Sequence, residues 1–150
     1  MKSKDYVPGL KVTCVREGGI QTERTSLEDP AKVWELAKQY IGLPGEEREH
    51  FVVFFLDARN VVKGVQTVSI GTLTASLVHP REVYRPAVVS GSAAVIVCHN
   101  HPSGDLEPSA EDREATRRIA QAGRILGVSL LDHVIVTDAG YSSFRQRGYL

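Results

Sequence analysis

The sequence predicts an α/β (α+β) fold, a three-layer α/β/α sandwich with a mixed central sheet. Short β-favouring runs alternate along the chain with segments that have helical periodicity. One of these runs, residues 93–98, is apolar throughout, which is typical of a strand covered on both faces. With 150 residues, 42% of them hydrophobic, the chain can bury one core. We expect one domain over residues 29–150, preceded by an N-terminal extension of residues 1–28.

The sequence indicates little helix or strand before residue 29. The extension is mixed and polar, and its short apolar stretch at residues 10–15 suggests an edge strand. Asp29 and Pro30 then supply an N-cap and a proline at the first helical position, and apolar residues follow at helical spacing. This pattern predicts a helix that ends near residues 42–45.

The middle of the chain predicts a hairpin and a second helix. Residues 50–56 and 61–70 are rich in residues that favour strands, and residues 57–60 between them have turn composition. Pro80 is expected to begin a helix that ends near Gly91.

The last third of the chain predicts a helix between two buried strands. The first strand is the apolar run at residues 93–98. Residues 109–126 have apolar residues at helical spacing with arginines and glutamates between them, and Gly127 is placed to end this helix. Residues 128–136 resemble a last buried strand.

The overall charge and the cysteines narrow the classes of function. Lysine plus arginine and aspartate plus glutamate number 18 each, so the composition favours neither a nucleic acid nor a membrane surface as partner. The two cysteines, Cys14 and Cys98, are too few for a disulfide framework, which favours a reducing compartment. No apolar run has the length of a signal peptide or a membrane span. We therefore expect a cytoplasmic protein.

A candidate metal site follows the apolar run at residues 93–98. His99 and His101 are separated by one residue at a strand end, so their side chains point to the same side. A turn rich in proline and glycine leads to a helix start with Asp112 in its first turn. Two imidazoles and one carboxylate leave the fourth tetrahedral position open, which is typical of catalytic zinc. The pattern predicts one Zn²⁺ per chain.

Each piece of this pattern also has an ordinary structural explanation. Ser109 and Asp112 have the spacing of a capping pair that would stabilise any helix start. His-x-His alone is a weak signal. The combination of buried strand, His-x-His, constrained loop and acidic helix start favours metal binding. Ser109 could both cap the helix and donate to a developing oxyanion.

The spacing of these residues resembles that of a known family. His99-x-His101, seven residues, Ser109, two residues and Asp112 is similar to the complete JAMM motif of the JAB/MPN metalloproteases. The resemblance implies a cytidine-deaminase-like α/β/α fold, zinc on the two histidines and Asp112, and Ser109 supporting the tetrahedral intermediate. It also implies a glutamate before the first long strand as general base.

Further segments resemble the RadC branch of that family: residues 79–83, 99–105, 108–109 and 131–135. The resemblance covers residues 30–150. The helix-hairpin-helix segment that precedes this part in full-length RadC proteins has no counterpart in these 150 residues, so we expect a DNA-binding role to lack its usual support.

The general base and the groups behind the ligands are less sharply indicated. Glu49 stands directly before residues 50–56, where the family motif has its glutamate, and is our choice for the base. Glu46, Glu47 and Glu82 are alternatives. Behind the ligands, we expect Asp132 and His133 to be candidates for a hydrogen bond to a ligand imidazole, although both could equally serve the core.

The leading functional hypothesis is a zinc-dependent hydrolase of the JAMM type that cleaves a peptide or isopeptide bond in a protein or peptide substrate. The alternative is a catalytically silent or nuclease-like RadC-family protein that acts as a scaffold in DNA repair or recombination. A deaminase of the same fold would need His-x-Glu and Pro-Cys-x-x-Cys, and the sequence has neither. The sequence predicts no particular oligomeric state.

Overall fold

The computed structural model describes residues 4–71 and 78–150, and its helices and strands alternate along most of the chain. They are α1 (Pro30–Ile41), β1 (His50–Leu56), β2 (Val62–Ile70), α2 (Pro80–Val89), β3 (Ala94–Asn100), α3 (Ala110–Leu126), β4 (Ser129–Val136) and β5 (Tyr141–Ser143). The predicted hairpin corresponds to β1 and β2, which pair antiparallel.

The described strands form one sheet in the order β2-β1-β3-β4-β5. β1 lies antiparallel to both β2 and β3, and β5 lies antiparallel to β4. β3 and β4 are parallel, so the chain must cross over between them, and α3 makes this crossover. The sheet is therefore mixed, as predicted.

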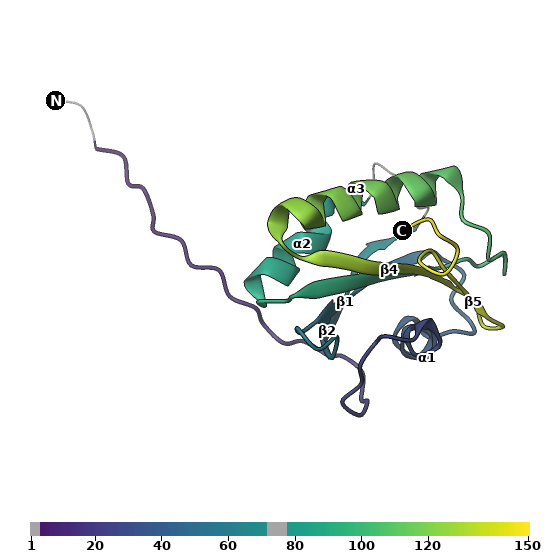
Figure 1. Ribbon diagram of the computed structural model, residues 1–150. Coiled ribbons are helices and arrows are strands. Elements are labelled where there is room, and N and C mark those ends of the chain that lie inside the picture. Colours follow the sequence, from purple (N-terminus) through teal and green to yellow (C-terminus); the bar gives the residue numbers. More distant parts are fainter. Residues whose placement is uncertain (1–3, 72–77) are drawn as a thin grey trace.

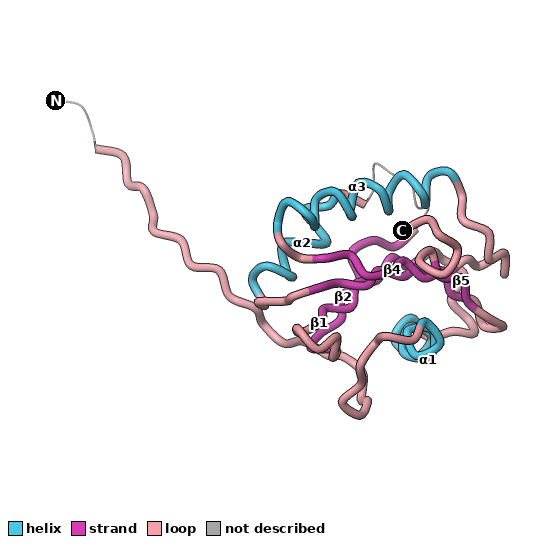
Figure 2. The backbone as a smooth tube through the Cα atoms, viewed as in Figure 1, coloured by secondary structure: helices cyan, strands magenta, loops and turns pink. Residues whose placement is uncertain are grey.

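Helices cover both faces of the sheet. Figures 1 and 2 show α1 on one side of the sheet and α2 and α3 on the other. Leu36, Phe54 and Ile96 belong to the core between α1 and the sheet. Val97 and Ile119 belong to a second core on the opposite side. The predicted three-layer α/β/α sandwich is confirmed.

The helix ends follow the predicted capping residues. The Asp29 side chain accepts a hydrogen bond from the backbone N–H of Ala31 (2.9 Å) at the start of α1. Gly127 adopts a left-handed conformation (φ 72°) and ends α3. At the start of α2, the ring of His79 accepts from the backbone N–H of Arg81 (3.1 Å) and so caps the helix.

Tyr84 and Gly123 fix the close approach of α2 to α3. The Tyr84 hydroxyl donates a hydrogen bond to the backbone carbonyl of Ile119 (2.8 Å). A Cβ atom on Gly123 would clash with the Tyr84 hydroxyl and the Val128 carbonyl, so only glycine fits this position. Burial raises the pKa of Tyr84 to about 12. This contact fixes the helix that carries Asp112.

Two expectations for the strands were wrong. Residues 10–15 form no strand; Leu10, Val12 and Val15 are 68–89% exposed, and Figure 1 shows this part of the chain running away from the domain. The extension instead makes one isolated antiparallel bridge, Ser26 with Val61. The strand at residues 128–136 is also not the last, because β5 follows it. The separation of the extension from the domain at residue 28 stays a prediction.

The two cysteines lie in different surroundings. Cys14 is exposed and Cys98 is buried, and both are free thiols. Burial raises the pKa of the Cys98 thiol well above its ordinary value. In residues 4–71 and 78–150, every helix is too short or too polar to cross a membrane.

Candidate metal centre

Strand β3 carries His99 into the interior of the molecule and leaves His101 near the surface. His99 is fully buried, and its ring lies against that of Phe51 on the neighbouring strand β1, with 6.1 Å between ring centroids. His101 follows the end of β3 and keeps 12% of its side chain exposed. Their Nε2 atoms are 2.8 Å apart, so the two rings face the same point, as the strand geometry predicts.

The first turn of α3 supplies the carboxylate. The backbone N–H of Ser109 donates to Asp112 Oδ2 (2.9 Å), and the backbone N–H of Asp112 donates to Ser109 Oγ (3.0 Å). These two bonds form a complete capping box. Asp112 is 3% exposed. The conformation that caps the helix is also the one that points the carboxylate at the histidines, so capping and the approach of Asp112 to the histidines are compatible.

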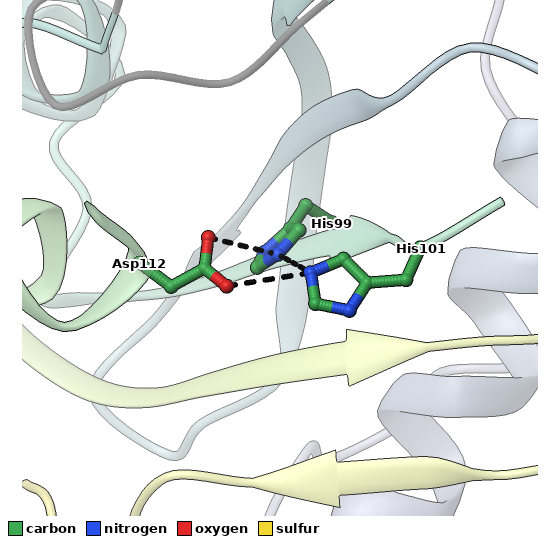
Figure 3. A group of neighbouring side chains, drawn as sticks. All are labelled: His99, His101 and Asp112. Carbon is green, nitrogen blue, oxygen red and sulfur yellow. Dashed lines mark hydrogen bonds and ion pairs between the residues drawn. The ribbon is translucent and has the colours of Figure 1, made fainter. Parts of the chain in front are cut away.

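The three side chains converge as Figure 3 shows. Asp112 Oδ1 lies 3.3 Å from His99 Nε2, and Oδ2 lies 3.3 Å from His101 Nε2. One ligand atom from each residue falls within 4.8 Å of the others. Three side chains from the end of one strand and the start of one helix therefore form a cluster with the spacing of a metal site.

The charges of this cluster suit a cation. Burial opposes ionisation of Asp112, but hydrogen bonds with His101 and His99 hold its pKa well below its usual range. Burial also disfavours a protonated His101, but its contacts with the Asp112 carboxylate and the Asp105 carbonyl raise the pKa of His101 overall. Asp112 is thus a carboxylate at neutral pH, and its negative charge is available to a cation bound between the three side chains.

The donor set fits zinc. His101 Nδ1 lies 2.7 Å from the backbone carbonyl of Asp105, and a carbonyl only accepts, so Nδ1 carries the proton of the neutral ring. In that neutral ring, Nε2 of His101 is the nitrogen with a lone pair available to a metal ion. Two imidazole nitrogens and one carboxylate oxygen, with other positions left open, are the ligands of catalytic zinc sites.

His133 and Asp132 lie on opposite sides of β4. His133 Nε2 lies 2.6 Å from His99 Nδ1, so His133 does contact a candidate ligand. Burial lowers the pKa of His133 well below its ordinary value. Asp132 contacts no ligand imidazole among its described bonds; it accepts from the Ser143 hydroxyl (2.5 Å) and from the backbone N–H of Arg145 (3.0 Å). Burial raises the pKa of Asp132. Asp132 ties β5 and the following turn to β4.

One residue near the candidate ligands, Thr116, was not identified from the sequence. Thr116, 2% exposed on α3, lies with its Oγ1 atom 2.6 Å from His133 Nδ1 and donates to the backbone carbonyl of Asp112 (2.7 Å). A threonine four residues after Asp112 is an ordinary helix position in the sequence, and nothing there signals its neighbour on β4.

The four candidate bases differ in their surroundings. Glu49 is partly buried directly before β1; after the Asp112 and Asp105 contacts, its charge is a further contributor that raises the pKa of His101, so it acts on the site electrostatically. Glu46 accepts from the backbone N–H of Arg48 (3.1 Å) and lies 3.2 Å from the His50 ring without hydrogen-bond alignment.

The remaining two glutamates are exposed or paired elsewhere. Glu47 is exposed. Glu82 lies in the first turn of α2, where it pairs with Arg81 (3.5 Å) and Arg85 (3.2 Å). The helix start that carries Glu82 explains its charge without any catalytic role.

A cleft opens beside His101. It has a volume of about 260 Å³ and is lined by residues 43–47, by residues of the 101–104 turn, and by Thr137 and Asp138. A shallow depression of about 280 Å³ between α2 and α3 touches none of the three candidate ligands. Of these two hollows in the described part of the chain, the cleft at His101 is the one that touches a candidate ligand.

Known proteins resemble this chain over most of its length. Residues 27–149 match the model of the RadC-like JAB domain. The UPF0758 protein STH371 of Symbiobacterium thermophilum is 50% identical over 137 residues, which are 91% of this chain and 57% of that protein. The UPF0758 protein of Thermotoga maritima is 49% identical over 124 residues, which are 83% of this chain and 54% of that protein.

A UPF0758 protein of Rubrobacter xylanophilus is 55% identical over 104 residues, which are 69% of this chain and 45% of that protein. The chain spans about half the length of the curated relatives it matches. The match to the domain model covers the strands, the helices and all three candidate ligands. The chain therefore belongs to the RadC-like JAB domain family.

Proposed function

We propose that this domain binds one zinc ion and hydrolyses an amide bond, peptide or isopeptide, in a protein or peptide substrate. The observation that carries the proposal is the convergence of His99, His101 and Asp112 beside an open cleft. A structural zinc site would be closed by further ligands. Here one of the three ligands, His101, stands in the cleft wall, where a substrate carbonyl can approach.

The side chains around the cluster have distinct tasks in this proposal. A bound zinc ion would polarise the substrate carbonyl. It would also lower the pKa of a water molecule, so that hydroxide would be available to attack at neutral pH. Ser109 is exposed, and its Oγ atom accepts the capping bond from Asp112, so that bond leaves its hydroxyl proton for donation. Ser109 would donate this proton to the negative charge that develops on the carbonyl oxygen.

Glu49 is the proposed general base. It would take a proton from the attacking water and deliver it to the leaving amine. Its place before β1, partly buried and in electrostatic range of His101, supports this assignment. Glu46 is held by Arg48, and Glu82 is paired on α2.

The metal is tested by mass spectrometry of purified protein. Wild type is expected to contain about one zinc per chain after zinc supplementation, and the folded variants His101→Ala and Asp112→Ala are expected to contain none. Glu111→Ala is the matched control, because Glu111 is the exposed acidic neighbour of Asp112 on α3. Wild type without zinc would overturn the proposal, and circular dichroism shows which variants are folded.

The reaction is tested on panels of peptides and isopeptide-linked proteins. Glu49→Gln is expected to keep its zinc and to lose about 10²- to 10⁴-fold in hydrolysis. Glu35→Gln, at an exposed glutamate of α1 that does not line the cleft, is expected to keep the wild-type rate. Chelation should abolish hydrolysis in all variants. Bound zinc with no hydrolysis of any substrate would contradict the enzymatic part and favour the scaffold function instead.

A further inference from the structure

A chain of three short hydrogen bonds connects two of the candidate ligands behind the metal site. Thr116 Oγ1 lies 2.7 Å from the backbone carbonyl oxygen of Asp112 and 2.6 Å from His133 Nδ1. His133 Nε2 lies 2.6 Å from His99 Nδ1. Thr116, His133 and His99 are all at most 2% exposed, so water does not compete for these bonds. We call these three contacts the Thr116 relay.

The direction of each bond in the relay follows from its neutral donors and acceptors. The Asp112 carbonyl can only accept, so the single hydroxyl proton of Thr116 goes to it. Thr116 Oγ1 must then accept from Nδ1–H of His133. In a neutral His133 ring the remaining nitrogen, Nε2, is an acceptor, so Nδ1–H of His99 donates to it.

This direction determines what His99 presents to the site. With its proton on Nδ1, a neutral His99 has a free lone pair on Nε2. That nitrogen lies 3.3 Å from Asp112 Oδ1 and 2.8 Å from the Nε2 atom of His101. The relay thus leaves His99 ready to bind a metal at the same point toward which His101 and Asp112 are directed.

Two aromatic rings lie against His133 and restrict the plane of its imidazole. Its ring stacks on Phe144, with 4.4 Å between centroids, and meets the edge of Phe51 at 5.5 Å. These two aromatic rings hold the imidazole in the plane that joins Thr116 to His99. The relay also connects α3 to β4 and β4 to β3 by hydrogen bonds. These bonds fix the position of Asp112 on the helix relative to His99 on the strand.

We propose that Thr116 and His133 are positioning residues that hold His99 in its Nδ1-protonated form and thereby strengthen zinc binding. The proposal rests on the zinc site proposed above. Partners of metal-ligating histidines orient the ring and select which nitrogen is free, and their loss commonly weakens metal binding 10- to 100-fold. The structure provides this support from a threonine and a second histidine.

Zinc affinity is the first test, measured by competition with a chromogenic chelator. Thr116→Val keeps the side-chain shape without the hydroxyl and is expected to weaken zinc binding about tenfold. Thr116→Ser, which keeps the hydroxyl, should restore most of it. Ser142→Ala is the control, because the Ser142 hydroxyl is buried but has no hydrogen-bond partner in the described part of the chain.

The protonation pattern of His99 is the second test, because it does not require zinc. In metal-free wild type at neutral pH, ¹⁵N NMR of the imidazoles is expected to show His99 protonated on Nδ1. Thr116→Val should lose this single pattern, and Thr116→Ala repeats the test if valine disturbs folding. Wild-type affinity together with an unchanged His99 spectrum in these variants would overturn the relay.

The two proposals can fail separately. If wild type binds no zinc but the His99 pattern depends on Thr116, the relay sets the protonation of His99, but its role in zinc binding and the hydrolase proposal are both wrong. If wild type binds zinc and hydrolyses amides but Thr116→Val changes neither affinity nor spectrum, the hydrolase proposal holds and the relay is wrong.

Discussion

The two faces of the central sheet are built from different interactions, although β3 contributes to both. Toward α1, Ile96 and Cys98 pack in a cluster of apolar side chains. Toward α3, Val97 also packs among apolar side chains. The next residue on that face is His99, which contacts the buried polar side chains of Asp112 on α3 and His133 on β4. Within one strand, alternate positions thus belong to a packed core and to a directed hydrogen-bond network.

The difference shows what each face requires from its residues. Apolar packing depends on volume and tolerates exchange among similar side chains. A buried polar network requires a partner for every donor and acceptor, and apolar residues of the same size would often be at least as stable. On the α3 face, the polar groups His99 and Asp112 converge on the candidate metal cluster, which is the arrangement that the proposed zinc site requires. The predictions below separate stability on one face from metal binding on the other.

The largest expected effect on stability lies on the α1 face. Phe54→Ala removes a fully buried ring from that core and should lower the free energy of unfolding by about 3–5 kcal/mol, measured by denaturant titration. The folded fraction is expected to keep one zinc per chain. Phe54→Leu, with a smaller change in volume, should cost less. Folded Phe54→Ala protein without zinc would show that the two faces are not separate.

The second-largest expected effect on stability comes from zinc binding. A ligand that binds only the folded state stabilises it by about 2.7 kcal/mol at a free concentration 100 times its dissociation constant. Zinc should therefore raise the melting temperature of wild type, and a chelator should reverse the rise. Asp112→Asn is the control and should not respond to zinc. An equal response in this variant would mean that the ion stabilises the protein from another place.

The smallest effect separates capping from metal binding at the start of α3. Ser109→Ala removes the capping hydroxyl and should lower the free energy of unfolding by about 1 kcal/mol, while Ser109→Gly should cost only a few tenths. Both variants are expected to retain zinc, because all three ligands remain. Loss of zinc in Ser109→Ala alone would indicate that the cap, and not only the ligands, holds Asp112 in place.

Local patterns in the sequence predicted most of the fold. The apolar run before His99, the capping residues Asp29 and Ser109, and Gly127 each act through neighbours in the chain, so their effects can be inferred without a structure. β5 has only three residues and no alternation long enough to recognise. Residues 10–15 have strand-like composition, but a strand also needs an available partner, which the sequence does not reveal.

In the candidate site, too, the sequence predicted what depends on neighbouring residues and missed what depends on packing between distant elements. The spacing of His99, His101 and Asp112 predicted their convergence, because a strand end and a helix start bring them together. Asp132 and His133 are adjacent in the sequence but point to opposite faces of β4, so only His133 meets a ligand. Thr116 could not be found, because its contact with His133 depends on how α3 packs on the sheet.

The three ligands also lie within one short stretch of chain, from residue 99 to residue 112, whereas His133 arrives only with β4. Closing so short a loop costs little conformational entropy, so the denatured chain can bring both histidines and the carboxylate to an ion. Binding to the denatured state subtracts from the stabilisation of the folded state. Zinc should therefore raise the melting temperature less than its affinity for the folded protein alone implies, and the shortfall measures how strongly the denatured chain binds zinc.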